Sequence, residues 1–279
     1  MSGPARWISV GELADAFDAD NNAPTQTAEL AGSTRTLHFE DGRIVEFRFL
    51  SASRLVWKTG DDASDEAGYF AIKPRDGIYF VDLVTGEAPP TAVSLVLDVE
   101  QNIATSLVAR LPESADVGES LMARAARGDE LTAVTADFSA AAIDGPFTAA
   151  TPRHEETTDL VGRRVEYTYS PTERYEHIYL NEHFYTWHCL LGSEKGLADT
   201  DRCHYLKLGE DLYLFVWREK IVPTLGAVVV DFRAMRTMGK IFGHAQSGTG
   251  GPTAGVADFP VGARARLRNI TLGHPDIAS

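Results

Sequence analysis

The chain has 279 residues, and its 26 Lys and Arg against 40 Asp and Glu give a formal net charge of −14 at pH 7. An acidic surface repels phosphate backbones and anionic lipids, so neither general nucleic-acid binding nor docking on a membrane surface is expected. Apolar residues make up 44% of the sequence, as in globular proteins, which excludes disorder of the whole chain.

The sequence also predicts a cytoplasmic protein. No apolar run reaches the ~18 residues of a membrane span, and residues 1–7 lack the apolar run of a signal peptide. The two cysteines, Cys189 and Cys203, are too few for a disulfide scaffold, and we expect both to be reduced.

Strands dominate the elements expected along the chain. Residues 43–50 read R-I-V-E-F-R-F-L, which alternates polar and apolar side chains as a half-buried strand does. In the first half of the chain we expect a helix at 10–17 and strands at 43–50, 69–84, 94–98 and 103–109, with the turn P-R-D-G dividing 69–84 into two runs. A helix at 115–126, a strand at 132–140 and a linker at 149–156 are expected next. In the second half we expect strands at 227–231 and 237–242 and a flexible glycine-rich loop at 247–255. Short strands at this spacing predict an up-and-down antiparallel barrel or a sandwich, and a barrel of about eight strands holds one small ligand.

Two segments, residues 30–109 and 160–242, read alike and indicate a tandem duplication. The offset drifts only by a few positions, as insertions in loops allow. Matching residues lie 130 to 134 positions apart: Gly32 and Gly162, Glu46 and Glu176, Trp57 and Trp187, Lys73 and Lys207, Tyr79 and Tyr213, Pro90 and Pro223, Asp98 and Asp231.

Polar residues are distributed unequally between the two repeats. Leu37 and Phe39 of the first repeat correspond to Tyr167 and Tyr169 of the second. Residues two apart on a strand share a face, so two hydroxyls are expected where the first repeat has hydrocarbon. Buried tyrosines need hydrogen-bond partners, which favours a polar ligand or a buried polar network; the plain alternative is that aromatic residues simply suit strands.

Glu219 is the second asymmetric residue, because its counterpart in the first repeat is Thr85. A carboxyl in the wall of an apolar cavity has a raised pKa and can act as a general acid or base. The alternative is a solvated loop glutamate between Arg218 and Lys220. Glu176 has a counterpart in the first repeat and is interpreted as structural.

No metal and no cofactor are predicted. The second repeat contains clustered histidines beside the two cysteines, but they lack the spacing of zinc ligands. No GxSxG elbow is present, and no GxGxxG segment follows a strand. The cluster comprises His177, His183, His188 and His204.

The segment L-A-G-S-T-R-T-L-H-F at residues 30–39, together with the block 160–243, resembles the MoaF family. That resemblance implies two tandem calycin (lipocalin-like) antiparallel β-barrel units in an all-β chain with few short helices. We place the first unit, with its short leading helix, at residues 1–148, and the second, which carries the expected site, at 149–279.

Residues 160–242 are also similar to phenolic acid decarboxylases, which are cofactor-free lipocalin-like enzymes. The matching motifs are V-G, Y-T-Y and Y-E within 161–176, N-E-H at 181–183, and K-L-G-E-D-L-Y-L-F-V-W-R-E at 207–219. The resemblance implies catalytic roles for Tyr167, Tyr169 and Glu219. It also implies a substrate-binding wall of Tyr175, His177, Trp187, Tyr205 and Trp217.

One part of that family's pattern is missing from this sequence. The family has a catalytic Arg in a Gly-Arg-Trp stretch, whereas residues 193–199 read S-E-K-G-L-A-D. Lys195 or Arg202 could supply a positive charge, but neither matches the motif, and an ammonium group does not bind a carboxylate as a guanidinium does. A neutral phenolic or enol-like substrate therefore fits the sequence better than a cinnamate.

The leading hypothesis is a cofactor-independent lyase or isomerase that acts on a small phenolic or conjugated substrate in the second barrel. The alternative is a non-catalytic protein that binds a small aromatic or hydrophobic molecule, and a barrel without a cavity is a third interpretation. A homodimer stays open. The enzyme hypothesis expects Glu219 to share one cavity with Tyr167 and Tyr169.

Overall fold

The computed structural model describes residues 6–17, 21–60, 64–86, 88–113, 120–246 and 255–271. The chain forms two compact units. The first barrel unit comprises Pro24–Glu113 and Val134–Glu155, and the second comprises Met1–Ala23, Ser114–Ala133 and Glu156–Ser279. No described helix is long and apolar enough to cross a membrane.

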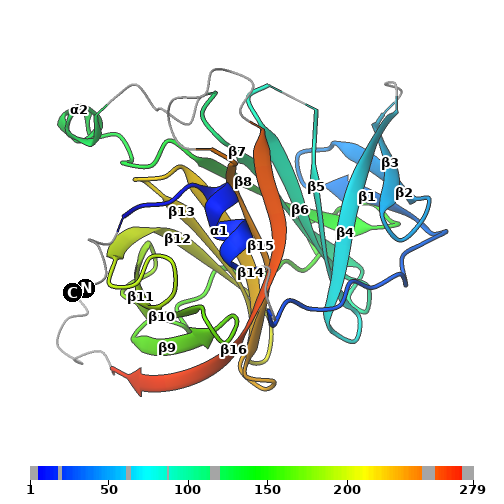
Figure 1. Ribbon diagram of the computed structural model, residues 1–279. Helices are drawn as coiled ribbons and strands as arrows, with labels where there is room; N and C mark the ends of the chain where they lie inside the picture. The colour runs from blue at the N-terminus through cyan, green and yellow to red at the C-terminus, as the bar shows by residue number, and fades with distance from the viewer. Residues whose placement is uncertain are drawn as a thin grey trace. The chain divides into compact units, whose positions relative to one another are not determined.

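The first unit is a closed antiparallel barrel in which each strand pairs with the next along the chain and the eighth pairs back with the first (Figure 1). Its apolar core includes Leu37 and Phe39, both buried. The strands are β1 (Thr34–Phe39), β2 (Ile44–Phe49), β3 (Arg54–Thr59), β4 (Asp65–Arg75), β5 (Ile78–Val84), β6 (Thr91–Asp98), β7 (Ile103–Arg110) and β8 (Thr135–Ile143).

The second unit repeats this strand order in a second closed barrel, in which the last strand pairs with β9. The prediction of an all-β chain with two tandem antiparallel barrels is therefore confirmed. The strands are β9 (Arg163–Thr168), β10 (Arg174–Tyr179), β11 (Phe184–Leu191), β12 (Ala198–Gly209), β13 (Leu212–Glu219), β14 (Thr224–Asp231), β15 (Arg236–His244) and β16 (Val256–Ile270).

Local details recur at the offsets that the sequence predicted. Gly32 and Gly162 both have a positive φ, of 78° and 82°, which favours glycine. The backbone N–H of Gly32 donates to the carbonyl oxygen of Phe49 at 2.7 Å, and that of Gly162 donates to the carbonyl oxygen of Tyr179 at 2.8 Å. A group of one acidic residue, one lysine and one tyrosine also occurs in both barrels. Glu29 binds Lys73 and Tyr79 in the first barrel, and Asp159 binds Lys207 and Tyr213 in the second.

The first helix, α1 (Val10–Phe17), forms where the sequence predicts it but belongs to the second unit. It contacts β15 and β16, and its buried Val10 and Phe17 join the core of the second barrel. The second compact unit thus includes α1, because the apolar face of this helix is buried by strands far along the chain, and the domain boundary at residue 148 stays a prediction.

The remaining predicted elements are displaced by a few residues or lie partly outside the described chain. Helix α2 (Leu121–Arg127) begins after the capping residue Ser120, inside the expected 115–126, of which 115–119 are outside the described residues. Strand β8 begins three residues later than expected. Residues 247–254 of the expected glycine-rich loop are also outside the described residues. Cys189 and Cys203 are buried and free.

Candidate functional site

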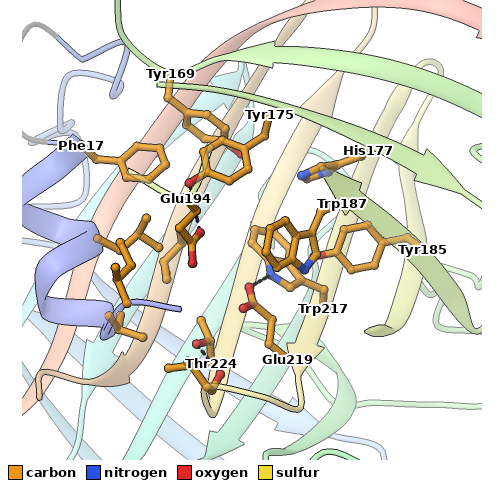
Figure 2. Close-up of a pocket in the computed structure, with 15 residues that line it drawn as sticks. Phe17, Tyr169, Tyr175, His177, Tyr185, Trp187, Glu194, Trp217, Glu219 and Thr224 are labelled. Carbon is orange, nitrogen blue, oxygen red and sulfur yellow. Dashed lines mark hydrogen bonds between the residues drawn. The ribbon is translucent and has the colours of Figure 1, made fainter. Parts of the chain in front are cut away.

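A cavity of about 40 Å³ lies inside the second barrel at the end covered by α1. Antiparallel strands alternate in direction, so the end of β9, the start of β10, the end of β13 and the start of β14 meet there. Figure 2 shows its wall, whose residues are Ile8, Val10, Leu13, Phe17, Tyr169, Tyr175, His177, Tyr185, Trp187, Glu194, Trp217, Glu219, Val222, Thr224 and Ile241.

Glu219 ends β13 and lies in this wall. Trp217, two residues earlier on the same face, donates from Nε1 to Glu219 Oε1 at 2.9 Å. Burial, and then the nearby charges of Asp201 and Glu194, raise the pKa of Glu219 well above its ordinary value. Arg218 faces the other way and binds Glu130 at 2.7 Å, so the alternation predicted around Glu219 holds.

The position of the Trp217 indole depends on a glycine in the neighbouring strand. Gly226 pairs directly with Trp217, and a Cβ there would come within 2.0 Å of the indole Cζ2. The corresponding pair in the first barrel is Leu83 and Val93. The second barrel therefore combines a large aromatic residue with an opposing glycine, and this places the indole N–H beside Glu219.

Glu194 is a second carboxyl in the cavity. It lies between β11 and β12, is 8% exposed, and accepts a hydrogen bond from the Tyr175 hydroxyl at 3.1 Å. Burial raises its pKa to about 7; the Tyr175 hydrogen bond opposes the rise, and the charge of Glu173 adds to it. Figure 2 shows both Glu194 and Glu219 at the same space. Near neutral pH Glu194 is therefore present in both protonation states, and burial disfavours the charged form of Glu219 as well.

Several neutral polar groups complete the wall. Tyr169 and Tyr185 are 3% and 1% exposed, and neither hydroxyl has a protein partner among the described residues. Burial raises the pKa of both hydroxyls, so they remain neutral donors. His177 is also buried, which lowers its pKa to about 3, and its Nδ1 has no partner in the described part of the chain. These groups are available to a ligand.

Aromatic rings make up most of the surface. Phe17 of α1 meets Tyr169 edge to face, with 4.7 Å between ring centroids, and stacks on Tyr175 at 6.0 Å. Trp187 packs against Tyr175 at 6.3 Å. Trp187 also donates from Nε1 to the buried Asp201 at 3.0 Å, which fixes its indole ring in the wall.

Six of the eight predicted site residues line this cavity, and two do not. Tyr167 faces the barrel interior, but its hydroxyl is paired with that of Tyr179 at 2.8 Å and is absent from the cavity wall. Tyr205 accepts a hydrogen bond from the Cys203 thiol at 2.9 Å and lines a separate hollow with His183. The six are Tyr169, Tyr175, His177, Trp187, Trp217 and Glu219.

The residues considered as sources of positive charge lie elsewhere. Lys195 is exposed, and Arg202 pairs with Glu130 at 3.0 Å. Among the residues that the structure describes, no Lys or Arg lines the cavity. The described residues also contain no group of His, Cys, Asp and Glu placed to hold a metal. Glu176, interpreted as structural, binds Arg164 at 2.6 Å on the other face of β10.

Sequence reasoning missed Tyr185 and Glu194. Tyr185 was detectable, because Leu55 stands at the corresponding position of the first repeat, just as hydrocarbon corresponds to Tyr169. Glu194 lies between two strands, where no alternation or repeat offset marks a buried side chain. Its burial becomes visible only when α1 and β10 are in place.

The chain matches two family models. The MoaF N-terminal domain matches residues 5–113, and the MoaF C-terminal domain matches residues 154–271. Protein MoaF of Klebsiella aerogenes is 40% identical over 274 residues, which are 97% of this chain and 98% of that protein. A solved structure, "Crystal Structure of a putative beta-lactamase from Burkholderia vietnamiensis", covers 41% of this chain and 100% of its own at 13% identity; its TM-score of 0.33 carries no argument.

Proposed function

The chain belongs to the MoaF family, and we propose that its second barrel is a cofactor-independent lyase or isomerase acting on a small phenolic or conjugated molecule. The observation that carries the proposal is that Glu219 lines the same aromatic cavity as Tyr169, whose hydroxyl has no protein partner among the described residues. A carboxyl whose pKa is raised by burial keeps its proton at a higher pH than an ordinary glutamate does, so it can act as a proton donor.

Glu219 has the role of proton donor in this proposal. It gives its proton to a carbon of the conjugated system, and Trp217 Nε1, which already donates to Oε1, stabilises the resulting carboxylate. Glu219 then recovers a proton from the substrate's phenolic oxygen or from a neighbouring carbon, which completes an isomerisation. In a lyase, the group that leaves the carbon departs without its bonding electron pair, as carbon dioxide does; the proton from Glu219 takes its place on the carbon, and Glu219 then recovers a proton from water.

The other groups orient the substrate. The Tyr169 and Tyr185 hydroxyls are neutral donors suited to a phenolic or enolic oxygen, and neither must break a protein hydrogen bond to bind it. The apolar wall excludes water, which strengthens these hydrogen bonds relative to solution. Leu13 and Phe17 of α1 close the cavity and must shift to admit a whole ring.

The test is turnover of a panel of hydroxycinnamates and phenols by the wild type and by Glu219→Gln. Gln keeps the shape and can still accept from Trp217, but it cannot carry the proton, so turnover should fall by about 10²–10⁴ while ligand affinity changes little. Glu182→Gln, in the exposed β10–β11 turn of the same barrel, is the matched control. Normal turnover by Glu219→Gln would contradict the role of Glu219.

The alternative is a protein that binds a small hydrophobic molecule without converting it. The aromatic cavity beside α1 favours this alternative as well, because a binding site needs burial but no acid. It predicts ligand binding by the wild type, no turnover of any panel member, and little effect of Glu219→Gln on affinity.

A further inference from the structure

The cavity of the second barrel carries acidic groups without an opposing charge in its wall. Glu194 and Glu219 line it, and no Lys or Arg of the described part of the chain does. His177 is held neutral by burial. An anionic ligand would therefore meet two carboxyls and no counter-charge, which is the reverse of a carboxylate-binding site.

The surroundings of the two carboxyls add to the negative potential. Asp201 and Asp199 act on Glu219, and Glu173 acts on Glu194, in each case disfavouring the charged carboxylate. Lys220 lies outside the cavity wall and is already engaged, at 2.5 Å from Asp199 and 3.2 Å from Asp201. A cation inside the cavity would relieve this repulsion.

The aromatic rings of the wall also favour a cation, through cation–π attraction. Trp187 and Trp217 have the side chain with the strongest cation–π attraction, and Tyr169, Tyr175 and Tyr185 add three further aromatic rings to the wall. Such aromatic cages recognise organic ammonium ions when they are desolvated. The buried hydroxyls of Tyr169 and Tyr185, which have no protein partner in the described chain, remain for the rest of the ligand.

We propose that the ligand of this cavity is a small organic ammonium ion that bears a conjugated or aromatic group, and that Glu194 binds its ammonium group. Glu194 is held by Tyr175 at the α1 side of the cavity, while Glu219 is held by Trp217. The two carboxyls therefore have separate tasks: Glu194 anchors the cation, and Glu219 remains free to move a proton. This assignment rests on the proposed function for the choice of cavity and for the role of Glu219.

The test compares three ligands with the same ring and different head groups, namely benzylamine, benzyl alcohol and benzoate. Binding is measured by calorimetry at pH 8, where benzylamine is still largely protonated and Glu194 is mostly ionised. The wild type should bind benzylamine at least about tenfold more tightly than benzyl alcohol, as one charge-assisted hydrogen bond and a cation–π contact suggest, and benzoate most weakly.

Two variants show whether Glu194 itself binds the ammonium group or whether the negative charge of the barrel in general attracts it. Glu194→Gln should abolish the preference for benzylamine and leave benzyl alcohol affinity within about twofold, since the shape and the Tyr175 hydrogen bond are kept. Glu182→Gln removes the same charge from an exposed turn of the same barrel and should leave the preference intact. Equal affinities of the wild type for amine and alcohol, or tightest binding of benzoate, would overturn the inference.

The binding measurements and the turnover assay together distinguish a wrong ammonium assignment from a wrong enzyme proposal. If neutral phenols are turned over in a reaction that depends on Glu219 while benzylamine has no advantage, the enzyme proposal stands and the ammonium assignment falls. If benzylamine is preferred in a manner that depends on Glu194 and no conjugated substrate is converted, the cavity is an amine-binding site without catalysis.

Discussion

Replacing Glu194 by Gln should change how the stability of the protein depends on pH. Glu194 is 8% exposed, and burial raises its pKa from an ordinary 4.5 to about 7. An acid whose pKa is raised in the folded state stabilises the fold fully below its unfolded pKa and loses that contribution as the pH rises through the folded value. At about 1.4 kcal/mol for each pH unit between the two values, the loss is roughly 3 kcal/mol.

Gln is neutral at every pH, and its amide oxygen can still accept from the Tyr175 hydroxyl. Glu194→Gln should therefore match the wild type near pH 4 and exceed it by roughly 3 kcal/mol in free energy of unfolding at pH 8.5. Urea denaturation across this range measures the difference, with Glu182→Gln as the exposed control that should run parallel to the wild type. A Glu194→Gln curve that also runs parallel would refute the desolvation of this carboxyl.

Three further substitutions test the wall of the cavity. Tyr167→Phe removes the partner of the Tyr179 hydroxyl and should lower the free energy of unfolding by about 1–3 kcal/mol in thermal or urea denaturation. Tyr169→Phe removes a hydroxyl without a protein partner in the described chain, so it should lower turnover or ligand affinity with little change in the free energy of unfolding. A loss of stability as large as that of Tyr167→Phe would assign Tyr169 to a structural network. Gly226→Ala brings a Cβ into the Trp217 indole and should cost about 1–3 kcal/mol by overpacking, and a shift in tryptophan fluorescence should accompany the loss.

Much of the fold was predictable because side-chain alternation fixes which face of a strand is buried. Matching residues at offsets of 130 to 134 positions predicted two similar units. Side-chain alternation correctly predicted that Tyr169 and Glu219 point inward. The contact of α1 with β15 and β16 was not predictable from a local pattern, because it joins segments far apart in the sequence.

Other parts of the site depended on cross-strand neighbours. Tyr167 and Tyr169 look equivalent in the sequence, but Tyr179 of the adjacent strand takes the hydroxyl of Tyr167 and leaves that of Tyr169 unpaired. Glu194 follows no strand pattern, so its burial depends on the segments that pack around it. The sequence predicted which face of a strand is buried, but only the structure shows the hydrogen-bond partner of each polar atom.

A crystal structure of the protein with 4-vinylphenol would show whether the second barrel binds its ligand at the α1 end. The ring should lie among Tyr169, Trp187 and Trp217, with its hydroxyl at hydrogen-bond distance from a tyrosine hydroxyl of the wall. Because the empty cavity measures only about 40 Å³, Phe17 should be displaced from its contact with Tyr169. Density for the ligand in the first barrel, or only on the outer surface while Phe17 keeps its place, would show that the second barrel does not bind the ligand at this end.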